Sequence, residues 1–268
     1  MNRLLLAVSC AIAAAAFALD VWGADPNGTQ SSDPTSANDL KELSDPTILT
    51  RRVWLETEWN KFTDGTSTVE ETLAALWAWQ LTDSMDWAVR LRLPAKFRFG
   101  SDNPDVSDVG GLGDIKPAIG GAYRINKAWR VGGGLELQIP TGRHEISDNV
   151  WRIQEFGAMA WDLTPWLTLS PSFEYNQSIA EEGSARRLHF IETFYPATII
   201  LPHKWAITTQ YELKADFENN NYLTHSAKLL VAKELGNIPL SFALSVRRSF
   251  DSGENEFRMN FIVTYYFR

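Results

Sequence analysis

The side chains best suited to do chemistry are cations that recur at alternate positions in residues 86–99. Arg90, Arg92, Lys96 and Arg98 all carry even numbers, whereas the odd-numbered residues between them are apolar. Successive side chains of an extended chain point to opposite faces, so this spacing puts the four cations on one face of a strand. Such a row would attract anionic or polarisable solutes, or it would pair with carboxylates.

Neighbouring segments with a similar alternation supply further charges on the same predicted face. The residues selected as candidates for solute selectivity are Arg90, Arg92, Lys96, Arg98, Arg130, Glu136, Arg152, Glu174 and Glu212. Other charged residues assigned to this face are Arg52, Lys116, Arg124, Glu56, Glu58 and Asp216. Charges inside a narrow interior are costly unless they are paired or hydrated. A network of structural salt bridges is therefore an open alternative to a solute-attracting basic ladder, and one network could serve both purposes.

Signatures of enzyme catalysis are weak in this sequence. It has no Gly-x-Ser-x-Gly nucleophile elbow, and His144, His189, His203 and His225 are not spaced as a metal-binding pair. The only cysteine, Cys10, lies in the leader, which excludes a disulfide or thiolate–metal framework from the mature chain. We therefore predict that the protein is not an enzyme and that it has no catalytic residues, no metal and no cofactor.

From Leu49 onward the chain is a series of amphipathic segments joined alternately by short and by longer polar connections. The short connections are 81–85, 125–127, 163–165, 201–203 and 235–238, and the longer ones are 62–68, 100–113, 141–149, 178–185, 216–221 and 251–255. We count about twelve segments of roughly ten to fourteen residues, which is longer than the ~5–6 residues usual in globular sheets. It is close to the ~9–11 residues that span a bilayer as a tilted strand.

Tryptophan is concentrated near the short connections. Of the 11 tryptophans in the chain, those that lie within a few residues of a short connection are Trp77, Trp79, Trp87, Trp129, Trp161, Trp166 and Trp205. Indole prefers the headgroup zone of a membrane because it combines an apolar body with one N–H donor. The sequence therefore predicts an all-β fold, a transmembrane antiparallel up-and-down β-barrel of about 12 strands with short periplasmic turns and longer extracellular loops. A soluble β-sandwich, whose strands would also alternate, is the alternative.

Two segments fit this interpretation less well. Residues 69–80 are rich in alanine and leucine, which would also suit a helix, and Leu76 breaks their alternation. Residues 189–200 carry apolar side chains on both faces and contain Pro196, so the strand there is assigned mainly because the hairpin rhythm requires one.

The two ends of the chain carry features of export and assembly. Residues 1–24 are typical of a cleaved secretory signal peptide, with a membrane anchor as the alternative. Residues 25–47 are polar and predict a flexible periplasmic segment, with a small plug or a periplasmic contact as alternatives, and residues 48–268 form the predicted barrel. The aromatic ending Tyr265–Phe267 resembles a C-terminal signal for barrel assembly. The predicted location is the outer membrane of a Gram-negative cell.

The charge balance and the predicted location together define the expected partners. The formal net charge of −8 argues against nucleic acid. We expect contacts with outer-membrane lipid, lipopolysaccharide, a small-molecule solute and the barrel-assembly machinery. Solvation is the simplest account of the loop carboxylates, and the alternative is that some of them bind divalent cations that bridge lipopolysaccharide; they are Asp102, Asp105, Asp108, Glu181, Glu182, Asp251 and Glu254.

Three short motifs resemble those of a known bacterial family. They are Gly111–Lys116, with a Gly-x-Gly-Asp strand start, then Trp129–Leu135, and finally Ile139–Gly142, with a Pro-Thr-Gly strand end. Together they resemble the MetA-pathway phenol-degradation family of outer-membrane β-barrels, over most of the predicted barrel. The resemblance implies a transport-type protein for small aromatic or other hydrophobic compounds, and it supplies no site residues.

The function that the sequence favours is a passive outer-membrane channel or transporter for small solutes. Twelve strands lie between filled barrels of about eight strands and open porins of about 16–18, which predicts a narrow pore. Two alternatives stay open. One is an outer-membrane lipid hydrolase, which needs a serine beside a histidine on the lipid-facing surface, and His225 is the histidine placed for it. The other is a structural or adhesive barrel whose loops contact partners.

Overall fold

The computed structural model describes residues 45–100, 108–183, 185–235, 238–251 and 255–267. All regular secondary structure in these ranges is β-strand, and none of it is a helix that could cross a membrane. The predicted leader, residues 25–44, and the loop carboxylates Asp102, Asp105 and Glu254 lie outside the described residues. The strands are β1 (Arg52–Phe62), β2 (Ser67–Thr82), β3 (Met85–Phe99), β4 (Val109–Leu112), β5 (Lys116–Arg124), β6 (Trp129–Gln138), β7 (Val150–Thr164), β8 (Leu167–Leu169), β9 (Ser172–Glu181), β10 (His189–Leu201), β11 (Trp205–Asp216), β12 (Tyr222–Glu234), β13 (Leu240–Ser249) and β14 (Asn255–Tyr266).

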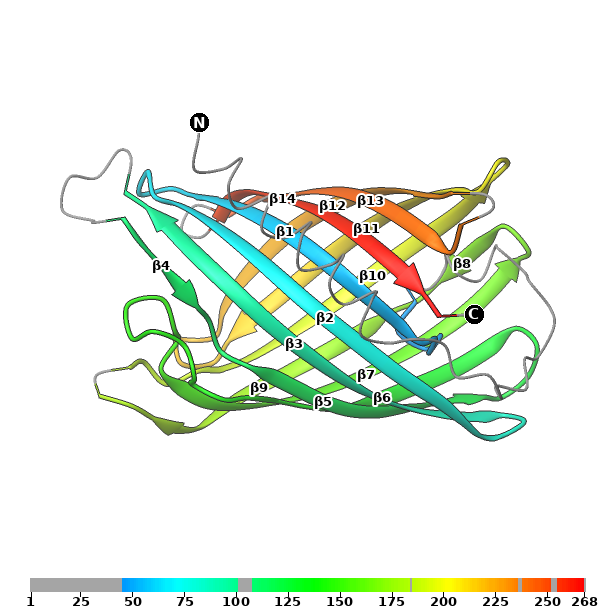
Figure 1. Cartoon of the computed structure of the whole chain (residues 1–268), viewed down its shortest axis with the longest axis horizontal. Helices are drawn as coiled ribbons and strands as arrows, with labels where there is room; N and C mark the ends of the chain where they lie inside the picture. The colour runs from blue at the N-terminus through cyan, green and yellow to red at the C-terminus, as the bar shows by residue number, and fades with distance from the viewer. Residues whose placement is uncertain (1–44, 101–107, 184, 236–237, 252–254, 268) are drawn as a thin grey trace. The chain divides into compact units, whose positions relative to one another are not determined.

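These strands close into an antiparallel barrel of twelve strand positions (Figure 1). Strands pair with their neighbours along the chain, and β1 pairs with β14 to complete the circle. β4 and β5 share one position beside β3, and β8 and β9 share one position between β7 and β10. The predicted fold class and number of strands are therefore confirmed.

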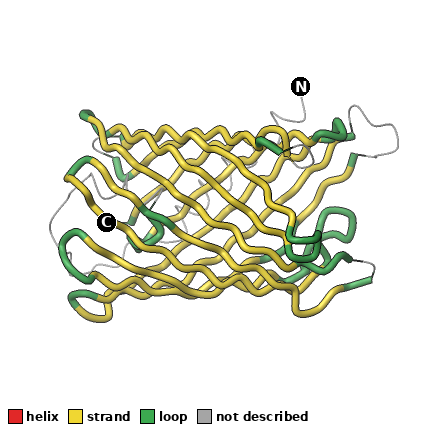
Figure 2. The backbone as a smooth tube through the Cα atoms, turned by 180° about the vertical axis from the view of Figure 1, so that it is seen from behind, coloured by secondary structure: helices red, strands yellow, loops and turns green. Residues whose placement is uncertain are grey.

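The connections gather at the two ends of the barrel (Figure 2). We name the end with the turns after β2, β5, β7, β10 and β12 the short-turn end, and the opposite end the long-loop end. The connection predicted to be long at 62–68 is tight, because only residues 63–66 lie between β1 and β2. Gly65 allows this turn, since its φ of 82° lies in the left-handed region that glycine enters without steric cost.

The apolar face of the strands lies on the outside of the barrel. On β3, Val89, Leu91 and Leu93 are 42%, 42% and 40% exposed. The large side chains that are almost fully buried are predominantly polar, among them Gln138, Glu234, Asn176, Thr168, Thr198 and Thr264. In a β-sandwich the apolar side chains would instead be packed between two sheets. The distribution therefore excludes the sandwich.

Aromatic side chains occupy the outside of the barrel near both ends. At the short-turn end Trp129 and Trp161 stack with ring centroids 4.9 Å apart. At the long-loop end Trp59 and Phe257 meet edge to face at 5.7 Å. Two aromatic bands on either side of an apolar belt are the arrangement expected where a bilayer meets its headgroups.

Both of the poorly patterned segments are strands. Residues 69–80 lie in β2, which pairs with β3 along its length and with β1 over residues 67–76. Residues 189–200 lie in β10, which continues through Pro196 because β8 and β9 separate opposite that residue. Pro171, in the gap between β8 and β9, and Pro196 both lack the N–H that a ladder hydrogen bond needs, which accounts for the interruption.

A second interruption separates β4 from β5. The three residues Gly113–Ile115 oppose two residues of β3, Leu93 and Pro94, which makes a β-bulge. Pro94 has no N–H to offer, and its carbonyl accepts a hydrogen bond from the N–H of Gly113 at 2.8 Å. The central residue of the bulge, Asp114, is only 5% exposed. The bulge therefore places a carboxylate inside the protein at the long-loop end.

Candidate functional site in the barrel interior

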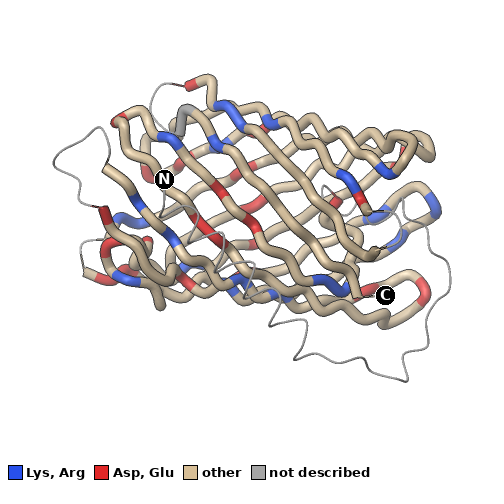
Figure 3. The backbone as a smooth tube through the Cα atoms, turned by 45° about the horizontal axis from the view of Figure 1, so that its top comes forward, with Lys and Arg blue, Asp and Glu red and all other residues tan. Residues whose placement is uncertain are grey.

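The charged residues selected from the sequence lie on the strand faces that point into the barrel. On each strand they share the alternation of the buried polar residues and not that of the exposed apolar ones. Charged positions recur along the strands as well as in the loops (Figure 3). The residues are Arg90, Arg92, Lys96 and Arg98 on β3, Arg130 and Glu136 on β6, Arg152 on β7, Glu174 on β9 and Glu212 on β11. Their role in selectivity stays a prediction.

Part of the interior charge is neutralised by ion pairs. Arg90 Nη2 lies 2.7 Å from Glu136 Oε2, across the intervening strand β5, and Glu136 is 2% exposed. On the other side of the barrel Arg247 Nε lies 2.5 Å from Glu212 Oε2. Burial of a carboxylate is tolerated here because each one has a charged partner and a hydrogen bond.

Other cations of the interior have no such partner. Among the described residues, no ion pair within 4 Å involves the four side chains that we name the basic cluster: Arg92, Lys96, Lys116 and Arg152. Arg92 faces Lys116 directly across the β3–β5 ladder, and Arg152 faces Gln138 across the β6–β7 ladder. Within the ladder on β3, therefore, Arg90 forms an ion pair, whereas Arg92 and Lys96 form none among the described residues.

Asp114 anchors the loop 139–149 at the long-loop mouth. Its carboxylate accepts hydrogen bonds from Gln138 Nε2 at 2.8 Å and from the Ser147 hydroxyl at 2.6 Å. The backbone N–H groups of Gly142 and Asp148 also donate to it, at 3.1 and 3.2 Å. Both oxygens of the carboxylate are thus used by the loop and by β6, and the Gly-x-Gly-Asp and Pro-Thr-Gly motifs meet at this point.

Asp148, in the same loop, is accessible to solvent in the mouth of the barrel. Its Oδ2 accepts a hydrogen bond from Gln138 Nε2 at 2.9 Å. Desolvation by the surrounding protein raises the pKa of Asp148, but the Gln138 amide and the charges of Lys96, Arg152 and Lys116 lower it by more. The pKa therefore lies below its usual value, and the carboxylate is ionised at neutral pH.

At the short-turn mouth the chain folds into the barrel before β1 begins. Asp45, 1% exposed, accepts hydrogen bonds from Thr47 and lies 2.7 Å from Arg130 Nη2. Arg130 also binds Asp162 at 2.6 Å. Leu49 packs against an apolar cluster of β2 and β3 residues. We name residues 45–50 the inner segment; it includes the last three residues of the part predicted to be flexible.

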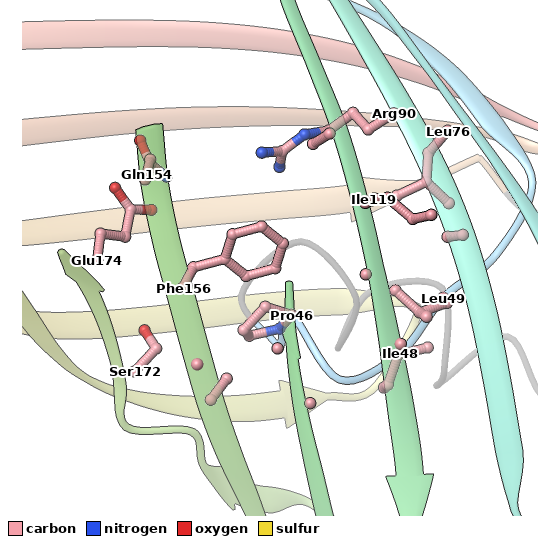
Figure 4. Close-up of a pocket in the computed structure, with 18 of the residues that line it drawn as sticks. Pro46, Ile48, Leu49, Leu76, Arg90, Ile119, Gln154, Phe156, Ser172 and Glu174 are labelled. Carbon is pink, nitrogen blue, oxygen red and sulfur yellow. The ribbon is translucent and has the colours of Figure 1, made fainter. Parts of the chain in front are cut away.

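A cavity of about 150 Å³ lies between the inner segment and the barrel wall (Figure 4). Its apolar side is formed by Pro46, Ile48, Leu49, Leu76 and Phe156, together with small residues of β5 and β6 that include Ala118, Gly120 and Gly132. Its polar side is formed by Arg90, Gln154, Ser172 and Glu174. A second cavity, of about 470 Å³, lies nearer the short-turn mouth beside Asp86, Arg124 and Lys127.

Sequence reasoning did not select the residues that hold the two mouths, Asp45, Asp114, Gln138 and Asp148. Their partners are distant in sequence: 85 residues separate Asp45 from Arg130, and 24 separate Asp114 from Gln138. The only signal for Asp114 was its place in the Gly-x-Gly-Asp motif. A proline one strand away from that motif would have been a second signal, since it favours a bulge.

His225 lies on the outer face of β12 near the long-loop end. Its imidazole contacts the hydroxyl of Tyr211. The Ser226 hydroxyl donates instead to Glu212 inside the barrel at 2.8 Å, and the Ser249 hydroxyl to the backbone carbonyl of His225 at 3.4 Å. Among the described residues, then, no serine hydroxyl bonds to this imidazole, so the serine–histidine pair that the hydrolase alternative needs is not seen there. In loop 139–149, His144 contacts Asn149 at 2.9 Å.

Comparison with known proteins places the fold. No family model matches the chain and no curated protein does, so the resemblance to the MetA-pathway phenol-degradation family is not confirmed. The COG4313 outer membrane channel from Pseudomonas putida F1 is similar with a TM-score of 0.71 at 15% identity, over 82% of this chain and 96% of that one. The NanC porin is similar with a TM-score of 0.56 at 12% identity, over 81% of this chain and 99% of that one. The translocator domain of the autotransporter NalP from Neisseria meningitidis is similar with a TM-score of 0.55 at 13% identity, over 85% of this chain and 93% of that one.

At these identities the likeness shows the fold, a β-barrel of the outer-membrane type. Channels, porins and autotransporter translocators all use it, so the function has to be argued from the interior.

Proposed function

We propose that this protein is an outer-membrane channel for the passive passage of small solutes, including small aromatic or other hydrophobic compounds. The observation that carries the proposal is an interior lined by accessible charged side chains within a barrel whose outside is apolar. An apolar exterior suits lipid and a polar interior suits a water path. In the cell the short-turn end would face the periplasm and the long-loop end the exterior, after export by a signal peptide in residues 1–24.

Similar structures support this role by analogy of fold. The structure from Pseudomonas putida F1 is described as an outer membrane channel, and NanC is described as a porin. The likeness in fold supports the passage of solutes and does not identify the solute.

The choice of solute follows from the cavity behind the inner segment. Its volume is about 150 Å³, and an apolar cavity of roughly 150 Å³ accepts benzene. Ile48, Leu49 and Phe156 offer apolar contact to a ring, and Arg90, whose guanidinium carbon lies 5.8 Å from the centre of the Phe156 ring, suits a carboxylate or a phenolic oxygen. A small aromatic acid fits both halves of this lining.

Liposome swelling tests the proposal. Vesicles that contain the protein should admit benzoate faster than a saturated polar solute of similar mass, because only the aromatic acid matches both sides of the cavity. Leu49→Trp should slow the entry of benzoate by filling the cavity. Leu91→Trp is the matched control, since Leu91 is exposed on the outer face of β3. Failure of wild-type vesicles to swell in any small solute, together with absence of conductance in planar bilayers, would overturn the channel.

A further inference from the structure

The loop 139–149 folds over the interior at the long-loop mouth. A Cβ atom at Gly111, on the inner face of β4 opposite Lys96, would lie 3.4 Å from Ile146 Cδ1 and 3.5 Å from Arg143 Cδ. Ile146 is 6% exposed, although it belongs to a loop. The loop therefore packs against the inner wall and does not project away from the barrel.

Asp114 has no capacity left for a solute. Four groups donate to its two oxygens, and three of them belong to the loop: the backbone N–H groups of Gly142 and Asp148 and the Ser147 hydroxyl. A Cβ at position 142 would lie 2.9 Å from Asp114 Oδ1, so only glycine permits this approach. The carboxylate acts as an anchor for the loop.

Asp148 is the opposite case, because its carboxylate is accessible and accepts a hydrogen bond from Gln138, the residue that faces Arg152 across the β6–β7 ladder. It interacts electrostatically with Lys96, Arg152 and Lys116, three of the four members of the basic cluster. Each of these cations lacks a close ion pair among the described residues. The loop thus adds one negative charge beside these three cations, which also have the wall carboxylates Glu70 and Glu136 as neighbours.

Resting on the proposed channel function, we propose that Asp148 is a built-in counter-ion that sets the charge selectivity of the long-loop mouth, and that Asp114 is the positioning residue that holds it there. A mobile anion that approaches the basic cluster meets a potential that Asp148 partly cancels. Removal of this one charge exposes the cluster and favours anions.

Reversal potentials in planar bilayers under a KCl gradient test the proposal. Asp148→Asn keeps the size of the side chain and should raise the chloride-to-potassium permeability ratio severalfold. Asp148→Lys should raise it further in the same direction. Asp64→Asn is the matched control, because Asp64 is exposed in the 63–66 turn at the same end and its loss should leave the ratio unchanged.

The role of Asp114 is tested by a double-mutant cycle. Asp114→Ala should shift the ratio in the same direction as Asp148→Asn, since the released loop withdraws Asp148 from the basic cluster. The double variant should shift it no further than the larger single shift, because both changes act through one charge. Additive shifts would show that Asp114 acts only as a charge of its own and would overturn its positioning role.

The outcomes separate this inference from the channel itself. If the wild-type protein does not conduct, the channel proposal falls and the inference falls with it. If the wild type conducts and Asp148→Asn and Asp148→Lys behave like Asp64→Asn, the channel stands and the counter-ion is overturned. Should Asp114→Ala not fold, the two Asp148 variants still decide the principal claim.

Discussion

The two mouths of this barrel are each narrowed by a segment of chain, but the segments are held by opposite means. At the short-turn end a cation of the wall, Arg130, holds Asp45 of the inner segment through a buried ion pair, and Leu49 adds apolar packing. At the long-loop end an anion of the wall, Asp114, holds the loop 139–149 mainly through hydrogen bonds from neutral donors. The first segment is directed against an apolar cavity, and the second against the basic cluster.

The difference shows how one barrel can present two filters in series. Loss of the cation from a buried ion pair leaves a buried charge without its counter-charge. Loss of the Asp114 carboxylate leaves only neutral donors behind, which costs less for each group. We therefore expect the short-turn mouth to respond more strongly to a single substitution, and the predictions below are ordered accordingly.

The largest effect is expected from Arg130→Ala. It leaves the buried Asp45 carboxylate without a charged partner, a loss of roughly 3–5 kcal/mol for a buried pair, which should release the inner segment and raise single-channel conductance severalfold. Asp45→Asn removes the same ion pair without changing the wall and should act in the same direction. Arg124→Ala, on the neighbouring strand and beside the same mouth, is the control. Equal conductance in all four proteins would show that the inner segment does not limit the path.

A smaller effect is expected from Asp114→Ala at the other mouth. Loss of hydrogen bonds to a charged group costs about 1.5–3 kcal/mol each, and they do not add fully. The loop should become susceptible to trypsin after Arg143, whose side chain is already 59% exposed. Mass spectrometry of the fragments would measure this cleavage. Protection equal to that of the wild type would mean that Asp114 does not anchor the loop.

Gly142→Ala should disturb the same loop less. The new Cβ would lie 2.9 Å from both Asp114 Oδ1 and the carbonyl carbon of Gly113, and overpacking of this kind costs roughly 1–3 kcal/mol. Gly111→Ala is the matched control, since its Cβ would meet Ile146 at 3.4 Å, an ordinary contact. Tryptic cleavage after Arg143 should rise for the first variant and not for the second; the reverse order would contradict the role of Gly142.

The smallest effects are expected on the outer surface. Trp129→Leu removes the stack with Trp161, and Phe257→Leu removes the edge contact with Trp59 at the opposite end. Aromatic pairs contribute about 0.5–1.5 kcal/mol beyond their buried area. Urea unfolding followed by tryptophan fluorescence should show a modest loss for both, with unchanged conductance. An altered conductance would mean that the outer bands influence the path inside.

Much of the architecture could be predicted because its signals are local. The alternation in residues 86–99 fixes which side chains of β3 share a face, and the same holds for β11 and β14. The short connections and the tryptophans beside them indicated two distinct ends. The alternation was lost in residues 189–200, where apolar side chains occupy both faces of the strand. Phe190 and Phe194 point inward on β10 and break the pattern. The direction of such a strand depends on its neighbours and not on its own pattern.

The candidate site was predicted only in outline. The alternation along each strand predicted that Arg90 and Glu136 both point into the interior. It could not predict that they form an ion pair, because 46 residues and one strand separate them. Sequence left the salt-bridge network and the basic ladder as alternatives. In the part of the chain that the structure describes, Arg90 and Arg247 form ion pairs and the basic cluster forms none within 4 Å.

The sequence by itself determined that this chain forms strands with one apolar and one polar face, since the two-residue period of a strand is a local property. Only the tertiary structure decided that Asp45 meets Arg130, that Asp114 meets Gly142, and that Asp148 meets Gln138 beside Arg152. Closure of the barrel brings together groups that lie tens of residues apart. Which distant charges become neighbours depends on register, on bulges and on the path of the loops, and no local pattern encodes these.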